Sequence, residues 1–166
     1  MEIFITNDDG WGAKGILTIV RIMSELGHVT VVAPDGARSG MSNAITVAQP
    51  IYLRQLNDPS WGAEDWQKNV TVYTTNGTPS DCVKLAIDVV CEGDSSKIDL
   101  LVSGINHGSN AGINVIYSGT MGACFVGAEH GIPSIGFSID DHSPEADFSH
   151  MEKYLLELTK HLLEEK

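Results

Sequence analysis

The chain has 166 residues and a formal net charge of −12, with 10 Lys and Arg residues against 22 Asp and Glu residues. Its 42% hydrophobic and 19% charged content is that of a globular protein with a buried core, not of a disordered chain. The few basic residues form no cluster, which argues against a nucleic-acid polymer as partner, and no apolar stretch approaches the ~20 residues of a membrane span.

Strand and helix patterns alternate along the chain. Short apolar or β-branched runs predict strands at 3–5, 29–33, 70–75, 98–102 and 134–139. Helical spacing of apolar residues, or a helix-start signal, predicts helices at 16–26, from 78 onward, from 118 onward and at 149–164. This alternation predicts an α/β fold, a Rossmann-like doubly wound and mostly parallel sheet with helices on both faces. We expect residues 1–166 to form one domain.

Capping signals support two of these helices. Thr78 is a suitable N-cap, and Ser149 with Glu152 has the spacing of a capping box. The segment 54–69 is the least regular, and its two Trp residues are expected to pack at the edge of the core.

The cysteines show no metal-binding or redox spacing. The chain has three cysteines, Cys82, Cys91 and Cys124, and no two of them form a CxxC pair. We expect reduced core residues of a cytoplasmic protein, and the N-terminal residues lack the features of a signal peptide.

Four polar clusters follow predicted strands. They lie at 7–10, 35–40, 76–79 and 103–108. Any one of them alone is an ordinary turn. If the strands are parallel, however, all four lie at the same edge of the sheet, where ligands bind in open α/β folds.

The first cluster contains two adjacent carboxylates, Asp8 and Asp9. Their mutual repulsion would raise the pKa of one of them unless a cation lay between them. Together with a hydroxyl and an amide from the other clusters, they form an all-oxygen set that suits Mg²⁺, Mn²⁺ or Ca²⁺ rather than zinc. His107 lies in the fourth cluster and is a weaker candidate for a group beside the metal ligands.

Small residues at 117–123 open a predicted helix. Backbone amides at a helix N-terminus can bind an anion, although Ser118 could equally be a plain N-cap. The chain has neither a GxxxxGK[ST] nor a GxGxxG motif, which argues against P-loop and dinucleotide binding. An anion site beside a divalent-cation site at the same edge of the sheet indicates phosphate monoester chemistry.

At these residues the chain resembles the SurE survival proteins, a family of metal-dependent 5′-nucleotidases. The matching stretches keep one order along the chain, at 6–10, 32–35 with 38–39, 77–83, 102–110 and 117–120. The resemblance implies a Rossmann-like core with one divalent cation, commonly Mg²⁺ or Mn²⁺, and a homodimer or homotetramer. Family members normally continue well past the position of Lys166, so a C-terminal oligomerisation region is expected to be missing here.

The resemblance also implies roles for particular residues. The metal-ligand positions of the family match Asp8, Asp9, Ser39 and Asn106. The expected substrate and phosphate contacts are Asn7, Gly40, Ser118, Gly119 and Thr120. The implied reaction is hydrolysis of nucleoside 5′-monophosphates, possibly also 3′-monophosphates, to nucleoside and phosphate.

The expected mechanism uses a water activated by the metal, with catalytic roles for Asp8, Asp9 and Asn106. A phosphoaspartyl intermediate on Asp8 is the rival chemistry, but a DxD spacing is absent. A receiver domain also carries paired acids, yet it needs an Asp and a Lys that the later strands lack. A Mg-nucleotide or phosphate-binding module without turnover remains open as the alternative.

Overall fold

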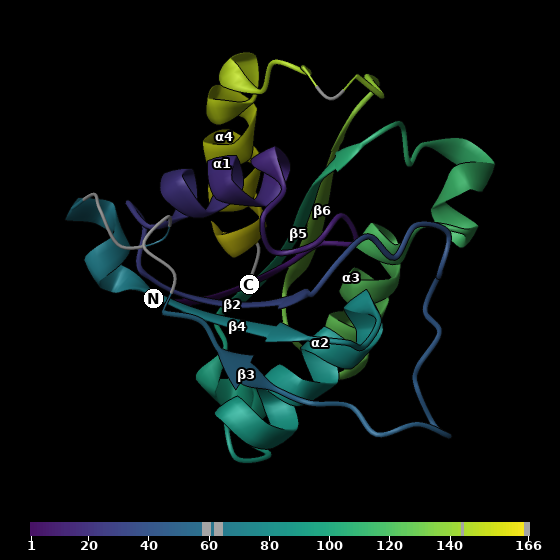
Figure 1. The fold of residues 1–166 in the computed structure, drawn as a ribbon. Helices are drawn as coiled ribbons and strands as arrows, with labels where there is room; N and C mark the ends of the chain where they lie inside the picture. Colours follow the sequence, from purple (N-terminus) through teal and green to yellow (C-terminus); the bar gives the residue numbers. More distant parts are fainter. Residues whose placement is uncertain (58–60, 62–64, 144, 165–166) are drawn as a thin grey trace.

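Six strands form one sheet in the computed structural model, which describes the chain except residues 58–60, 62–64, 144 and 165–166 (Figure 1). The strands are β1 (Glu2–Thr6), β2 (His28–Pro34), β3 (Arg54–Gln55), β4 (Val70–Thr75), β5 (Leu100–His107) and β6 (Ser134–Ile139). The α-helices are α1 (Lys14–Met23), α2 (Pro79–Leu85), α3 (Gly119–Glu129) and α4 (Glu152–Glu164). A π-helical turn, Ala86–Val90, continues α2, and short 3₁₀ turns lie at 65–69, 95–97, 112–116 and 149–151.

The sheet has the order β3-β4-β2-β1-β5-β6, and only the short edge strand β3 runs antiparallel to its neighbour. The chain passes from β1 outward to β2 on one side, whereas β5 and β6 lie on the other side of β1. The strand order therefore reverses between β1 and β5. In open α/β sheets this reversal leaves a crevice at the carboxyl ends of the two strands.

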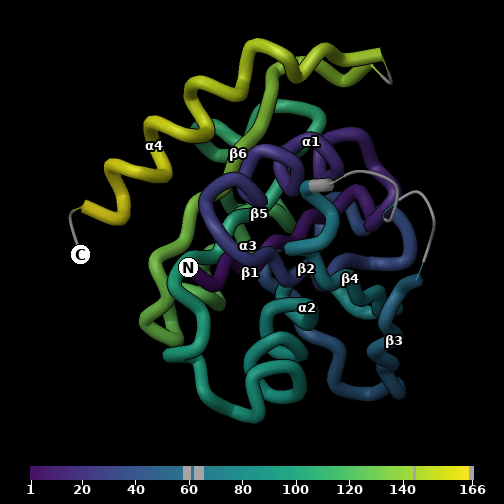
Figure 2. The backbone as a smooth tube through the Cα atoms, turned by 90° about the vertical axis from the view of Figure 1, so that its left-hand side faces the viewer, coloured from purple at the N-terminus to yellow at the C-terminus, as the bar shows by residue number. Residues whose placement is uncertain are grey.

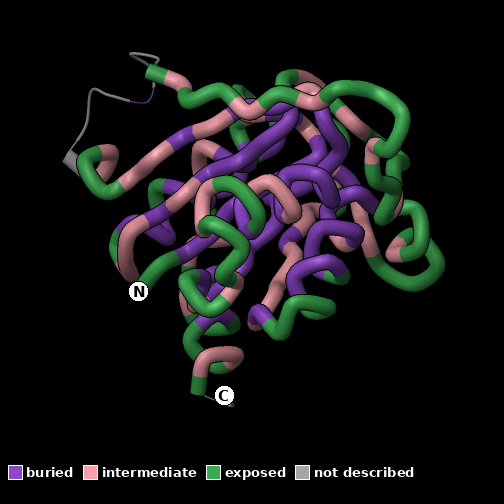
Figure 3. Tube along the Cα trace, turned by 90° about the horizontal axis from the view of Figure 1, so that it is seen from below, coloured by how far each residue is buried: buried purple, intermediate pink, exposed green. Residues whose placement is uncertain are grey.

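Helices cover both faces of the sheet, as the alternation predicted. On β1, Ile3 and Ile5 belong to the core under α1 and α4, whereas Phe4 belongs to the core over α2 and α3. This alternation follows from the two-residue period of a strand. Figures 1 and 2 show α1 with α4 on one side of the sheet and α2 with α3 on the other. Viewed from below, the central strands form a mainly buried layer framed by exposed loops (Figure 3).

Local signals were correct for two helix starts. The Thr78 hydroxyl accepts a hydrogen bond from the backbone N–H of Asp81, and the Asp81 carboxylate accepts one from the N–H of Thr78. Ser118 caps α3 by accepting from the N–H of Met121 at 3.1 Å. Trp61 is buried and packs against the α1 core, as expected for the irregular segment.

Other boundaries differ from the predictions. β5 runs from Leu100 to His107, so most of the fourth polar cluster is strand rather than loop. A register shift opposite β6, with Gly104 at a φ of +125°, lets the strand continue through these polar residues. The capping box at Ser149 was wrong, because its hydroxyl donates to Asp147 instead and a 3₁₀ turn precedes α4. α1 ends at Met23, earlier than expected.

The cysteines differ in accessibility. Cys82 and Cys124 are buried, and burial raises the pKa of each thiol to about 12, whereas Cys91 is only half-buried. Because the thiolate is the reactive form, we expect Ellman's reagent at neutral pH to modify Cys91 in the folded protein and the other two thiols only in denaturant. Mass spectrometry of the labelled peptides checks this result, and fast labelling of Cys82 in the folded protein would contradict the packing of α2.

Among the described residues, no helix combines the length and apolar character that crossing a membrane requires.

Candidate active site

A cleft of about 300 Å³ lies at the carboxyl ends of β1 and β5, where the strand order reverses. This volume is at the lower end of the range found for small-molecule sites. The cleft is lined by Asp8, Ser39, Gly40, Asn106, His107, Gly108, Ser109, Asn110, Asn114, Tyr117, Ser118 and His142. The predicted convergence of separate polar clusters at one edge of the sheet is therefore found for three of them and for the start of α3.

The turn after β1 is fixed by its own side chain. Asn7 is fully buried, and its Nδ2 donates to the carbonyl oxygen of Gly10 at 2.9 Å, while its Oδ1 accepts from the N–H of Gly10 at 3.2 Å. Gly10 has a φ of +100°, a conformation that favours glycine. This closed turn sets the direction in which Asp8 and Asp9 leave the strand.

Asp8 is a buried acid, with 5% of its surface exposed. Its Oδ1 accepts a hydrogen bond of 2.8 Å from the hydroxyl of Thr120 at the start of α3. The pKa of Asp8 is raised to about 6, chiefly by burial, while the hydrogen bond from Thr120 lowers it and the charge of Asp9 raises it. The ionised form is thus held in an unfavourable environment, which a bound cation would relieve.

The environment of Asp9 also disfavours the ionised carboxylate. Burial raises its pKa, and the charge and backbone of His107 partly offset this rise. Its Oδ2 is buried and has no hydrogen-bond partner among the described residues. A buried carboxylate oxygen without a partner is costly, so this atom is suited to a positive ligand. The ring of His107 packs edge-on against Phe148, with centroids 5.1 Å apart.

Ser39 and Gly40 reach the cleft from the segment after β2. The backbone N–H of Arg38 donates to the carbonyl oxygen of Asp8 at 2.6 Å, which fixes the chain just before Ser39. The guanidinium of Arg38 lies 2.7 Å from the Asp35 carboxylate and also donates to the carbonyl of Asn76. Arg38 is therefore already paired, although it is close to the site.

Asn106 is the second-last residue of strand β5, and 9% of its surface is exposed. Its Nδ2 donates to the carbonyl oxygen of Gly108 at 2.8 Å and, at 3.4 Å, to Oδ1 of Asn110. Because the amide nitrogen is engaged in this way, Oδ1 of Asn106 is the side-chain atom suited to a cation.

The start of α3 closes the other wall. Ser118 lines the cleft, whereas Thr120 is fully buried beneath it on Asp8. A Cβ on Gly119 would lie only 3.0 Å from Cβ of Asp8 and 3.1 Å from Cγ of Pro79. Glycine at this position lets the N-terminus of the helix come close to the carboxylate.

The predicted site residues are therefore divided by position. Cleft-lining residues are Asp8, Ser39, Gly40, Asn106 and Ser118, whereas the others lie behind or beside the wall: Asn7, Asp9, Gly119 and Thr120. The side chain of Asn7 is occupied by its turn and that of Thr120 by Asp8, so we expect indirect roles for both.

Sequence reasoning missed several residues of the cleft. Ser109, Asn110 and Tyr117 lie within the stretches that resemble the family but were given no role there. Asn114 lies in the 3₁₀ turn at 112–116 before α3, and His142 follows β6, far from any motif. No local pattern marks these two positions.

The residues present fit a hard cation better than a zinc site. Within the described parts of the chain, no three His, Cys, Asp or Glu side chains gather into a metal-binding group. The expected donors are instead two carboxylates, one hydroxyl and one amide, which are the oxygen ligands of Mg²⁺ and Mn²⁺. The residues that line the cleft, all within the described chain, include neither Lys nor Arg.

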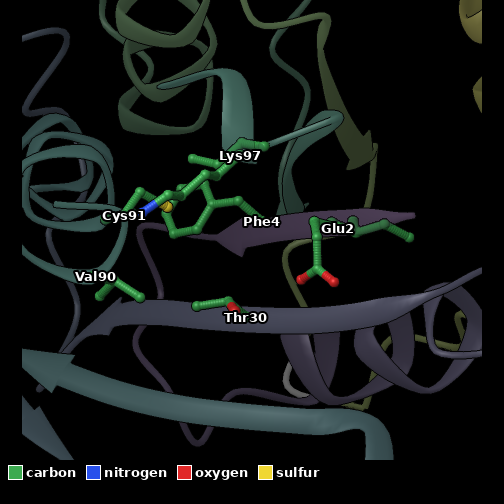
Figure 4. Close-up of a pocket in the computed structure, with 9 residues that line it drawn as sticks. Glu2, Phe4, Thr30, Val90, Cys91 and Lys97 are labelled. Carbon is green, nitrogen blue, oxygen red and sulfur yellow. The ribbon is translucent and has the colours of Figure 1, made fainter. Parts of the chain in front are cut away.

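A second cavity lies between β1, β2 and the turn after α2, in the part of the molecule shown in Figure 4. Its volume is only about 40 Å³, and Phe4, Val90 and Cys91 contribute to its lining. This space holds a few waters at most. It is much too small for a nucleotide, so we place the candidate site at the larger cleft.

The chain is similar in sequence to a family of known proteins. The family model described as Survival protein SurE matches residues 3–166. The chain is 46% identical over 161 residues to a protein of Cytophaga hutchinsonii and 45% identical over 163 residues to one of Porphyromonas gingivalis, both named 5′-nucleotidase SurE. These alignments cover 97% and 98% of this chain but 58% and 60% of the relatives.

A solved structure gives the same result for the fold. The crystal structure of the SurE protein from Aquifex aeolicus superposes with a TM-score of 0.83 at 33% sequence identity, covering 99% of this chain and 61% of that one. The described chain thus spans about three-fifths of the length of the proteins it matches. Because the family model matches nearly the whole length of this chain, the chain belongs to the SurE family.

Proposed function

We propose that the protein is a divalent-metal-dependent phosphomonoesterase that hydrolyses nucleoside 5′-monophosphates to nucleoside and phosphate. The observation that carries this proposal is the buried carboxylate of Asp8, with Asp9 next to it in the chain, in a cleft that has no Lys or Arg among its described lining residues. A phosphate dianion cannot approach two carboxylates without a cation between them. The names of the matched relatives support the same activity.

In this proposal four residues hold one cation. Asp8 and Asp9 provide carboxylate oxygens, and Ser39 and Asn106 provide a hydroxyl and an amide oxygen. When bound, the cation would neutralise charge on the phosphoryl group and lower the pKa of a water molecule. We favour Mg²⁺ or Mn²⁺ because the proposed donors are all oxygen atoms.

The chain itself would position the substrate. The first turn of α3 offers backbone N–H groups and the hydroxyl of Ser118 to the phosphoryl oxygens, with the positive end of the helix dipole behind them. Gly40 allows close approach from the opposite wall. Either Asp8 or Asp9 would orient or deprotonate the attacking water.

Thr120 and Asn7 would act indirectly. Thr120 holds Oδ1 of Asp8 by its hydroxyl, so that Oδ2 is the oxygen left for the cation. Asn7 maintains the turn from which both acids project. Asn110, Asn114 and His142 also line the cleft and would suit polar groups of the sugar.

The proposal extends to assembly and compartment. We propose a homodimer or homotetramer on the basis of family membership. Cytoplasmic localisation is supported by three cysteines that form no disulfide among the described residues.

The test is phosphate release from a panel of 5′- and 3′-nucleoside monophosphates, in EDTA and with added Mg²⁺ or Mn²⁺. We expect release that requires the metal, stops in EDTA and returns when excess metal is added, with 5′-monophosphates as the preferred substrates. Mn²⁺ binding without release under any metal would instead identify a metal-dependent binding module. Release that persists in EDTA would contradict the proposed role of the cation.

A further inference from the structure

A long exposed segment carries part of the proposed metal site. Residues 39–53, here called the arm, connect β2 to β3 without forming a helix or strand. Most of its residues are exposed, and the side chain of Val47 is 84% exposed. Because the arm buries little apolar surface, its position depends on a few polar contacts.

One of these contacts joins the arm to the segment that leads into α3. The hydroxyl of Ser42 donates to the carbonyl oxygen of Ile116 at 2.6 Å, and its backbone N–H donates to the carbonyl oxygen of Tyr117 at 3.1 Å. Ser42 has a φ of +54°, which is unusual for a residue other than glycine. Ser42 is three residues from Ser39, and Tyr117 is adjacent to Ser118.

Gly122 forms the other half of this contact. A Cβ on Gly122 would overlap the carbonyl oxygen of Ser42 and would lie 2.6 Å from its carbonyl carbon. The backbone of the arm therefore rests directly on α3, one turn after the helix begins. Only glycine allows this approach, although alanine is the better residue for the interior of a helix.

The arm is also fixed on both sides of Ser42. Before it, the N–H of Arg38 donates to the carbonyl oxygen of Asp8 at 2.6 Å. After it, the buried carboxylate of Asp81 accepts from the N–H of Thr46 at 2.9 Å and from its hydroxyl at 2.6 Å. Ser42 thus lies on a short stretch that is held at both ends, so we expect a displacement at Gly122 to move Ser39 as well.

We propose that Ser42 and Gly122 form a clamp that sets the separation between the metal wall of the cleft, at Ser39, and its phosphate wall, at Ser118. Both are positioning residues, since neither lines the cleft among the described residues. This inference rests on the proposed function and adds to it the expectation that metal and phosphate bind cooperatively.

The test compares Gly122→Ala, Ser42→Ala and the exposed-arm control Val47→Ala with the unaltered chain. Mn²⁺ affinity is measured by titration calorimetry, with and without inorganic phosphate, and thermal unfolding is followed for each variant. If metal and phosphate bind cooperatively, phosphate should tighten Mn²⁺ binding in the unaltered chain, and Mn²⁺ should tighten phosphate binding by the same factor.

For Gly122→Ala we expect Mn²⁺ binding weakened by about tenfold or more and a reduced effect of phosphate. The melting temperature should fall only slightly, because the exposed arm can move away from the new Cβ and alanine favours the helix. Ser42→Ala should weaken Mn²⁺ binding about three- to tenfold through loss of one hydrogen bond. Val47→Ala should match the unaltered chain.

Two results would overturn the clamp. Gly122→Ala with unaltered Mn²⁺ affinity and unaltered phosphate coupling would show that the contact does not position the site. A weakened Mn²⁺ affinity that only follows a lowered melting temperature would assign Gly122 a structural role. If the unaltered chain itself binds no Mn²⁺, the proposed function fails and the clamp fails with it, which is a different result from the other two.

Discussion

Asp8→Asn is expected to lower Mn²⁺ affinity and metal-dependent phosphate release by more than about 100-fold, because it removes a direct ligand where even indirect partners are worth 10–100-fold. The substitution keeps the size of the side chain and its hydrogen bond with Thr120. It removes the negative charge that the cation requires. Mn²⁺ titration and phosphate release, measured side by side, check this result.

The same substitution should stabilise the metal-free protein. Burial raises the pKa of Asp8 from 3.8 to about 6, so its ionised form costs the native state about 3 kcal/mol at neutral pH. With a raised pKa, the native state binds more protons than the unfolded state between these two values. Stability is therefore greatest below pH 4 for this group, and it is lost as the pH rises through about 6.

The difference between the two proteins isolates this effect. In EDTA, Asp8→Asn should unfold at higher denaturant than the unaltered chain at pH 7.5, and the difference should shrink toward pH 4. Added Mn²⁺ should reverse the order, because it stabilises only the protein that binds it. A variant that is less stable than the parent in EDTA at pH 7.5 would contradict the strained state of Asp8.

Gly15→Ala is the second large effect, and it acts on stability. Gly15 is buried in α1, and a Cβ at this position would overlap the carbonyl oxygen of Ile105 in β5. Neither backbone can yield easily within the core, so we expect a loss of about 2–3 kcal/mol in the free energy of unfolding. Urea denaturation measures it.

The effect should extend to the site, because Ile105 precedes the proposed ligand Asn106. Mn²⁺ affinity should fall together with stability. Gly12→Ala is the matched control, since a Cβ on Gly12 meets nothing within 4 Å. A loss of stability in Gly12→Ala equal to that in Gly15→Ala would show that the contact with β5 is not the cause.

Much of the fold could be predicted because its signals are local. The run at 3–5 alternates between two cores, and Thr78 and Ser118 cap their helices within three residues of themselves. The parallel order of strands then brings the ends of β1 and β5 together. From that rule the polar clusters could be expected at one edge of the sheet before any contact was known.

What could not be predicted depends on contacts between distant residues. The strand β5 continues through polar residues because β6 pairs with it beyond a register shift, and no periodicity in 103–107 indicates this. Ser149 has the spacing of a capping box but hydrogen-bonds to the nearer Asp147. The contact of Ser42 with Ile116 and Gly122 spans more than seventy residues and gives no signal in either segment.

A bound cation would also let a strongly acidic chain accept a phosphate substrate. A chain with a net charge of −12 handles a phosphate poorly unless a cation compensates locally. The nearest arginine, Arg38, is paired with Asp35 and structures the loop. We therefore propose that phosphate recognition depends on a cation held by Asp8 and Asp9.

The most direct test of that claim is paramagnetic broadening by substoichiometric Mn²⁺ in the amide NMR spectrum of the uniformly ¹⁵N-labelled chain. Broadening is expected to begin at the amides of 7–10, 38–40, 106–108 and 118–120 and to disappear in Asp8→Asn. Broadening that begins instead at surface acids, such as Asp140 and Asp141 after β6, with these four segments unaffected, would contradict a metal site at the carboxyl ends of β1 and β5.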